Sequence, residues 1–217
     1  MTRVKQDYTK ILTDILGNLA HLNHIQPSEI PHINLYMDQV TSFMEEHLSN
    51  SKRFEDDKIL TKTMINNYAK NKLLPPPEKK RYSKEHMLLL IFIYYFKNIL
   101  SINDIQTLLG PITEKYFKST GEKDLTYIYN EVFSMEKNRI ESLKKDLAKS
   151  YHVAEETFED ADEEDKKFLK TFSFICQLSF DVYIKKMLIE HLIDDMRPDE
   201  PTGKHRKEKA PKQPKEK

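Results

Sequence analysis

The chain has 217 residues, 38% hydrophobic and 32% charged, which is enough for one large or two small domains. Its 35 basic and 35 acidic side chains cancel, so bulk charge gives no support to nucleic-acid binding, and a single cysteine excludes a disulfide framework. Four glycines and no Asn-Gly or Asp-Gly pair favour helices with sharp breaks over a β-sandwich or barrel.

The first twenty residues resemble no signal peptide, because charged side chains interrupt them throughout. The longest apolar run, residues 87–96, is too short for a membrane span, which needs about twenty residues. A lone Cys176 in an apolar run fits a reducing compartment. We therefore expect a cytoplasmic protein with no membrane partner.

Apolar side chains recur at helical spacing through the first half of the chain. Two prolines break the pattern after the first helix, and three more follow the third. Gly110 and Pro111 are expected to end the last helix of this half. The spacing predicts helices over residues 7–21, 35–47, 61–72, 84–99 and 102–109.

The second half has fewer, longer helices. Apolar spacing predicts one over residues 124–149 and another over residues 164–195, which suggests an antiparallel hairpin or a dimerisation element. Between them, residues 155–165 hold eight acids and no base, as in a solvated connector. The segment 197–217 contains Pro, Lys and Glu and almost nothing apolar, so we expect it to be disordered.

The third predicted helix has an unusual polar face. On a helical wheel, one arc holds two amides, a hydroxyl and two ammonium groups but no carboxylate. Asn can bond bidentately to adenine and Lys can reach guanine or phosphate, so this chemistry suits a major groove. Ile65 and Tyr68 lie on the opposite, core-facing arc. The residues expected to face bases and nearby phosphates are Lys62, Thr63, Asn66, Asn67 and Lys70.

Basic residues gather around this helix. From 52 to 84 there are ten Lys and Arg against four Asp and Glu, in a chain that is neutral overall. Such a local patch is what attraction to backbone phosphates requires. Lys79, Lys80 and Arg81 come directly after the three prolines, so a short turn is expected to hold them against a flanking sugar-phosphate backbone.

The stretch "TKTMINNYAKNKLLPPP", followed by "RYSKEH" and "LSINDIQTLL", resembles the DNA-binding region of the mercury-resistance-regulator (MerR) superfamily. With "YMDQV", it also looks like a bacterial family of unassigned function, common in Gram-positive bacteria, whose members are usually described as transcriptional regulators. The resemblance covers roughly residues 34–109 and implies a helix-turn-helix with a basic wing. The segment "PEKKR" is shorter than the usual wing and lacks glycine, and Asn66 stands where arginine is usual. The positions that match the superfamily pattern are Ile65, Tyr68, residues 73–76, 82–85 and 101–109.

Metal and catalytic sites receive little support. His21, His24 and His32 lack accompanying Cys or acids, so they are interpreted as solvated or capping side chains. The stretch "EHLIDDM", residues 190–196, has the His-Asp pairing of metal-dependent hydrolases but no second set. The sequence predicts no enzyme activity, no metal and no cofactor.

Together these patterns predict an all-α protein with a MerR-like helix-turn-helix domain, a minimal wing and a long helical hairpin. The expected divisions are an N-terminal amphipathic helix (1–30), the DNA-binding domain (31–112), the hairpin for dimerisation or regulation (113–196) and a disordered tail (197–217). The expected function is sequence-specific binding of double-stranded DNA by a homodimer, in transcriptional regulation and more as a repressor than an activator. An effector is left unknown. The alternative is a helical protein-interaction adaptor without nucleic-acid binding.

Overall fold

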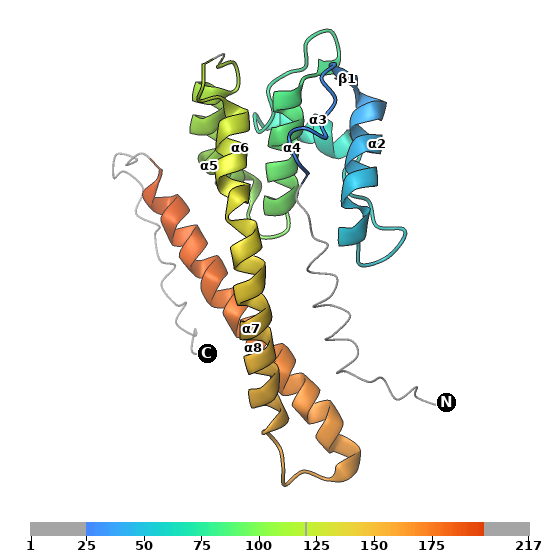
Figure 1. Cartoon of the computed structure of the whole chain (residues 1–217), viewed down its shortest axis with the longest axis vertical. Coiled ribbons are helices and arrows are strands. Elements are labelled where there is room, and N and C mark those ends of the chain that lie inside the picture. The colour runs from blue at the N-terminus through green and yellow to red at the C-terminus, as the bar shows by residue number, and fades with distance from the viewer. Residues whose placement is uncertain (1–24, 120, 198–217) are drawn as a thin grey trace, which may run out of the picture.

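The computed structural model describes residues 25–119 and 121–197. They form a mostly helical structure with one two-stranded antiparallel sheet, which pairs Leu35 with Tyr82 and Tyr36 with Arg81 (Figure 1). The helix predicted at residues 7–21 and most of the predicted tail lie outside the described residues. The elements are β1 (Leu35–Tyr36), α2 (Met37–Leu48), a 3-10 turn η1 (Ser49–Ser51), α3 (Lys62–Lys70), β2 (Arg81–Tyr82), α4 (Lys84–Phe96), α5 (Ile102–Tyr116), α6 (Leu125–Ser134), α7 (Glu136–Glu155) and α8 (Glu163–Asp195).

Helix α4 is the centre of the core. Its residues 86–94 are all buried, as expected for a helix that is apolar on every side. Figure 1 shows α4 between α2 on one side and α5 with α6 on the other. The Phe92 ring contacts the rings of Tyr129 and Phe133 on α6, at 5.4 and 5.6 Å between centroids. The hydroxyl of Tyr129 also donates to the carbonyl of Ile25 at 2.7 Å, so the start of the described chain is fastened to the same core.

The prediction that Gly110 and Pro111 end a short helix is wrong. Helix α5 continues through both residues to Tyr116, with Pro111 inside it. Proline usually clashes with the Cβ of the residue before it, but Gly110 has no Cβ, so the helical conformation is allowed there. Leu109 is buried and Ile112 packs against the core, so apolar contacts on both sides of the proline offset the one lost hydrogen bond.

The helix predicted over residues 124–149 is in fact two helices. Helix α6 ends at Ser134 and α7 begins at Glu136 and continues to Glu155, past the predicted end. The Ser134 hydroxyl donates to the Glu131 carbonyl at 2.8 Å, a local bond that competes with the helical ladder. The break also separates α6, whose Leu125 and Tyr129 are buried, from α7, which leaves the core.

Helices α7 and α8 contact one another, which agrees with the predicted hairpin. The chain turns back after α7 and α8 crosses it (Figure 1). The contact includes the rings of Tyr151 and Phe174, 5.5 Å apart and nearly perpendicular. Lys170 of α8 also pairs with Glu159 of the connecting segment. At its far end, α8 returns to the core region, where Arg197 pairs with Asp104 of α5 at 2.5 Å.

Candidate nucleic-acid interface

The first turn of α3 is fixed by its own sequence. The Thr61 hydroxyl caps the helix by accepting from the backbone N–H of Met64 at 3.1 Å. Ile65 and Tyr68 are buried against the core, as predicted. Burial raises the pKa of Tyr68, so its phenol stays neutral and serves as an anchor. The helix is therefore held by one face, and the opposite face is left for solvent or a partner.

The end of α3 is set by a backbone motif rather than by the three prolines. The N–H of Leu73 donates to the carbonyl of Tyr68 at 2.9 Å, and that of Lys72 to Ala69 at 3.1 Å. These two bonds, with φ of 58° at Lys72, form a Schellman motif. The helix ends at Lys70, before the predicted limit of 72. The motif brings the buried Leu73 under the helix and leaves Lys72 exposed on its outside.

All five residues predicted for the polar face of α3 are exposed. One of them is not free: the Lys62 ammonium pairs with the carboxylate of Asp38 on α2. The sequence showed no acid on this face because Asp38 comes from another helix. The other four predicted residues of this face are Thr63, Asn66, Asn67 and Lys70.

The segment after the prolines is a tight two-residue turn. The N–H of Arg81 donates to the Glu78 carbonyl at 2.9 Å, and the two residues form a single antiparallel bridge. Lys79 and Lys80 occupy the turn with φ of 48° and 63°. Positive φ at both central residues is typical of type I′ hairpin turns, which usually contain Asn or Gly there. Lysine in this conformation is strained, and both side chains are exposed.

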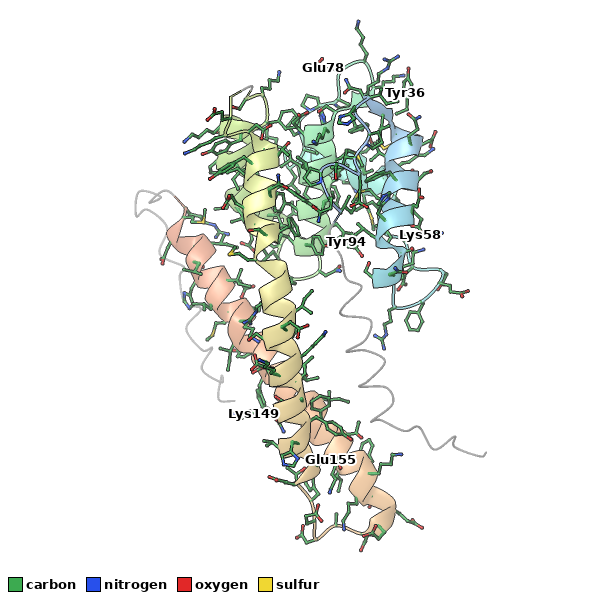
Figure 2. The ribbon with its side chains drawn as sticks, in the orientation of Figure 1. Tyr36, Lys58, Glu78, Tyr94, Lys149 and Glu155 are labelled. Carbon is green, nitrogen blue, oxygen red and sulfur yellow. The ribbon has the colours of Figure 1, made fainter. Side chains whose placement is uncertain are left out.

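Arg81, the third residue predicted to contact the DNA backbone, is held by the side chain of Tyr36. Its guanidinium donates to the Tyr36 hydroxyl from Nε at 3.1 Å and from a terminal nitrogen at 2.9 Å, and it lies 5.0 Å from the ring centroid. Tyr36 and Asp38 are two residues apart, so the start of α3 and the turn are both fastened to the start of α2. Figure 2 shows Tyr36 and Glu78 at this one end of the molecule.

The sequence did not predict that Tyr36 binds Arg81 or that Asp38 pairs with Lys62. No local pattern could reveal these contacts, because each partner lies more than twenty residues away. Lys72 was also missed, although an apolar residue directly after it is a sign of the Schellman motif. Among the described residues, no carboxylate pairs with Lys70, Lys72, Lys79 or Lys80, so these four ammonium groups remain available to an anion.

Other kinds of site find no support in the described part of the chain. It contains no group of three or more His, Cys, Asp or Glu side chains that could hold a metal ion. None of its helices is both long enough and apolar enough to span a membrane. Of the three histidines considered, His32 is exposed in a loop, and His21 and His24 lie outside the described residues.

One comparison with known proteins gives a match. Residues 25–132 match the model of a family described as a domain of unknown function (DUF1836). No curated protein and no solved structure matches the chain. The matched range contains α2 to α4 and the turn, and it ends within α6.

Proposed function

We propose that the protein binds double-stranded DNA in a sequence-specific way and regulates transcription, as a repressor. In this proposal α3 enters the major groove, and its Asn66 and Asn67 amides contact base edges. The observation that carries the proposal is the outward polar face of α3, with amides and an unpaired ammonium group. The family match names no function, so the proposal rests on this face and on the charges around it.

The turn supplies the second contact in the proposal. Its two strained lysines follow Glu78, which lies at the same end of the molecule as Tyr36 in Figure 2. Backbone strain of this kind persists where the surrounding structure enforces it and is common at functional sites. Lys79 and Lys80 would therefore contact phosphates beside the groove, as a minimal wing of a MerR-like helix-turn-helix. Arg81, already bound to Tyr36, would orient the turn more than contact DNA.

The direct test is fluorescence anisotropy of the full chain with a randomised duplex pool, followed by the sequences that selection enriches. Specific binding should exceed binding to unrelated duplex at least a thousandfold at physiological salt. The logarithm of affinity should fall linearly with the logarithm of salt concentration, with a slope that counts the neutralised phosphates. If no duplex is enriched and no salt-dependent binding occurs, the proposal is wrong.

The apolar surface of α8 supports a homodimer in this proposal. Twelve large apolar side chains between Phe168 and Met196 are 36% to 67% exposed. At about 150–250 Å² for a large side chain, they leave on the order of 1,000 Å² of apolar surface on one helix. A typical monomer exposes patches of only about 300–600 Å², and a stable interface buries about 800 Å² on each partner. A second copy of the chain would cover this surface.

In this proposal the spacing on α8 sets how two copies would pair. One stripe follows alternating steps of four and three residues, as in a coiled coil. Two antiparallel copies that cross at the small residue Ser179 would place Phe168 near Ile189 and Ile175 near Val182, with Phe172 opposite Lys186. The stripe consists of Phe168, Phe172, Ile175, Ser179, Val182, Lys186 and Ile189.

A parallel pair would bring the two acidic segments at residues 155–165 together. An antiparallel pair separates these acidic segments by the length of α8, which lowers their repulsion.

Disulfide trapping distinguishes the two directions. In a Cys176→Ser background, Ser179→Cys should link to itself because it lies on the two-fold axis of an antiparallel pair. Phe168→Cys should link to Ile189→Cys when the two variants are mixed, and not to itself. Self-linking of Phe168→Cys would indicate parallel helices. A monomer at every accessible concentration by light scattering would refute the homodimer.

The same apolar surface favours the alternative function, a helical adaptor for another protein. An adaptor would keep α8 open to a different chain and would need no DNA. A monomeric protein without salt-dependent DNA binding would fit the adaptor, whereas a dimer that binds duplex would exclude it.

A further inference from the structure

The two ammonium groups on the polar face of α3 lie in different surroundings. Lys70, in the last turn, is exposed, and among the described residues no carboxylate pairs with it. Lys62, the first residue of the helix, pairs with the carboxylate of Asp38 on α2. One group is therefore a free positive charge, whereas the other belongs to a pair with no net charge.

Asp38 is held beside α3 by its place on α2. It is the second residue of that helix, where the partial positive charge of the N-terminal turn favours an acid. Val40, two residues further on, is fully buried, so this turn is fixed to the core, and α2 packs against α3. The carboxylate therefore stays at the end of α3 that begins with Lys62, the end at which a recognition helix contacts base edges.

The pair limits what Lys62 can bind. An ammonium group has three N–H donors, and the side chains of Lys62 and Asp38 remain 61% and 77% exposed, so donors are left for a ligand. A phosphate that approaches Lys62 also approaches Asp38, and repulsion between the two anions offsets much of the attraction. The O6 and N7 atoms of guanine are neutral acceptors, which Asp38 does not repel in this way. The pair therefore weakens contact with any phosphate and leaves contact with a guanine edge.

We propose that Asp38 is a specificity-determining residue, because it makes Lys62 contact a guanine base in the major groove instead of a phosphate. In the bound state Lys62 donates to O6 and N7 of one guanine and keeps its bond to Asp38, while Lys70 contacts the phosphates. The inference deepens the proposed function and rests on it. It gives a role to an acid at a DNA interface, where an acid would otherwise only weaken binding.

Removing the charge of Asp38 is the main test. The full chain carrying Asp38→Asn is compared with wild type by fluorescence anisotropy, with the selected duplex and an unrelated duplex across a salt series. The affinity for the unrelated duplex should rise about three- to tenfold, and its salt slope should steepen by about 0.9, because Lys62 then neutralises a phosphate. The affinity for the selected duplex should change less, so the specificity ratio falls. Unchanged affinity and slope on the unrelated duplex would refute the inference.

Two matched variants show whether the charge and its position matter, since a loss of stability alone would weaken binding to both duplexes equally. Asp38→Glu keeps a carboxylate and should keep the wild-type specificity ratio. Glu46→Gln removes an exposed acid from the same helix, about 12 Å further along its axis, and should also leave the ratio unchanged. An equal fall in the ratio with Glu46→Gln would make the effect one of total charge and would refute a specific role for Asp38.

A double variant tests whether Asp38 acts through Lys62. When Asp38→Asn is combined with Lys62→Gln, the gain in salt slope on the unrelated duplex should disappear, because no ammonium group remains to neutralise the phosphate. A gain that persists would show that Asp38 acts through another group, and the inference would be wrong.

The guanine contact is tested on the DNA. Each guanine of the selected duplex is replaced in turn by 7-deazaguanine, which lacks the N7 acceptor but still pairs with cytosine. At one position the replacement should weaken wild-type binding about three- to tenfold, and Lys62→Gln should be insensitive there. Lys70→Gln should instead weaken binding to every duplex and keep this sensitivity. If no guanine position depends on Lys62, the inference is refuted.

The outcomes separate this inference from the proposed function. Absence of salt-dependent binding of the wild type to any duplex would refute both. Salt-dependent binding with a selected sequence, but with the same specificity ratio in wild type and Asp38→Asn, would keep the function and refute the inference.

Discussion

Helices α4 and α8 are both rich in large apolar side chains, yet their burial differs completely. All residues from 86 to 94 of α4 are buried, whereas Ile193 is the buried residue among the 33 of α8. Helix α4 has neighbours within the chain on every side. Helix α8 has α7 across part of its length and α5 at its end, and the stretch between is apolar and open.

The difference shows that apolar composition alone does not say where a helix finds its partners. For α4 the partners belong to the same chain, so its side chains stabilise the monomer. For α8 the described residues supply little cover, so in the proposed dimer the same kind of side chain would stabilise an association. Stability and assembly should therefore respond to different sets of substitutions.

The largest expected effect comes from the core helix. Leu89→Ala should lower the free energy of unfolding by about 2–5 kcal/mol, because it removes a fully buried side chain and leaves a cavity. Leu188→Ala, an equal deletion on the exposed surface of α8, should change it by less than about 0.5 kcal/mol in dilute protein. Urea denaturation measures both. Equal losses would contradict the contrast between the two helices.

The opposite pattern, a loss of dimer affinity rather than of folding stability, is expected for the apolar stripe on α8. Ile175→Asp should weaken the dimer by about 1.5–3 kcal/mol, since the half-exposed side chain is lost from both copies. Sedimentation equilibrium gives the dissociation constant. Lys167→Asp, which is on α8 but outside the stripe, is the control. A dimer that tolerates Ile175→Asp and not the control must use another face.

A substitution on the exposed face of α3 tests whether this face contacts DNA bases. Asn66→Ala should reduce discrimination among duplexes by about 1–3 kcal/mol if the amide contacts a base. Competition anisotropy with single-base variants of the selected site measures this loss. Asn50→Ala, exposed beyond the end of α2, should have no effect. An equal loss on every duplex would instead indicate a phosphate contact.

Two substitutions in the turn separate the effect of its charge from the effect of its backbone strain. Lys80→Gly should raise the free energy of unfolding by about 1 kcal/mol, because glycine adopts a φ of 63° without the cost that a side chain carries. It should also lower the salt slope of DNA binding by about 1. Lys80→Ala removes the same charge but keeps the strain, so it should match the second effect and not the first.

The smallest expected effect is a pH dependence of stability from His86. Burial holds its folded pKa below the unfolded value, so the unfolded chain binds more protons as the medium is acidified. This contribution to stability is complete above the unfolded pKa of about 6.5 and is lost as the pH falls toward the folded value. Thermal unfolding between pH 5 and 8 should show the decline. His86→Gln, which keeps a capping side chain, should reduce it.

Much of the fold follows from local patterns. The spacing of apolar residues located the helices predicted between residues 35 and 109 and helix α8, and it correctly placed Ile65 and Tyr68 against the core. It failed at Gly110 and Pro111, because a local stop signal cannot show that Leu109 and Ile112 pack on the core on either side of the proline. It also joined α6 to α7, since a periodic pattern cannot show that one part packs on the core while the next part leaves it.

The sequence by itself determined where most of the helices lie, which face of α3 is polar and that residues 155–165 are acidic, because these depend on neighbours a few positions apart. Only the tertiary structure decided that Asp38 pairs with Lys62, that Tyr36 holds Arg81 and that His86 is buried. It also decided that α4 is covered and α8 is not. Each of these depends on segments far apart in the chain, whose meeting is set by the packing of whole helices.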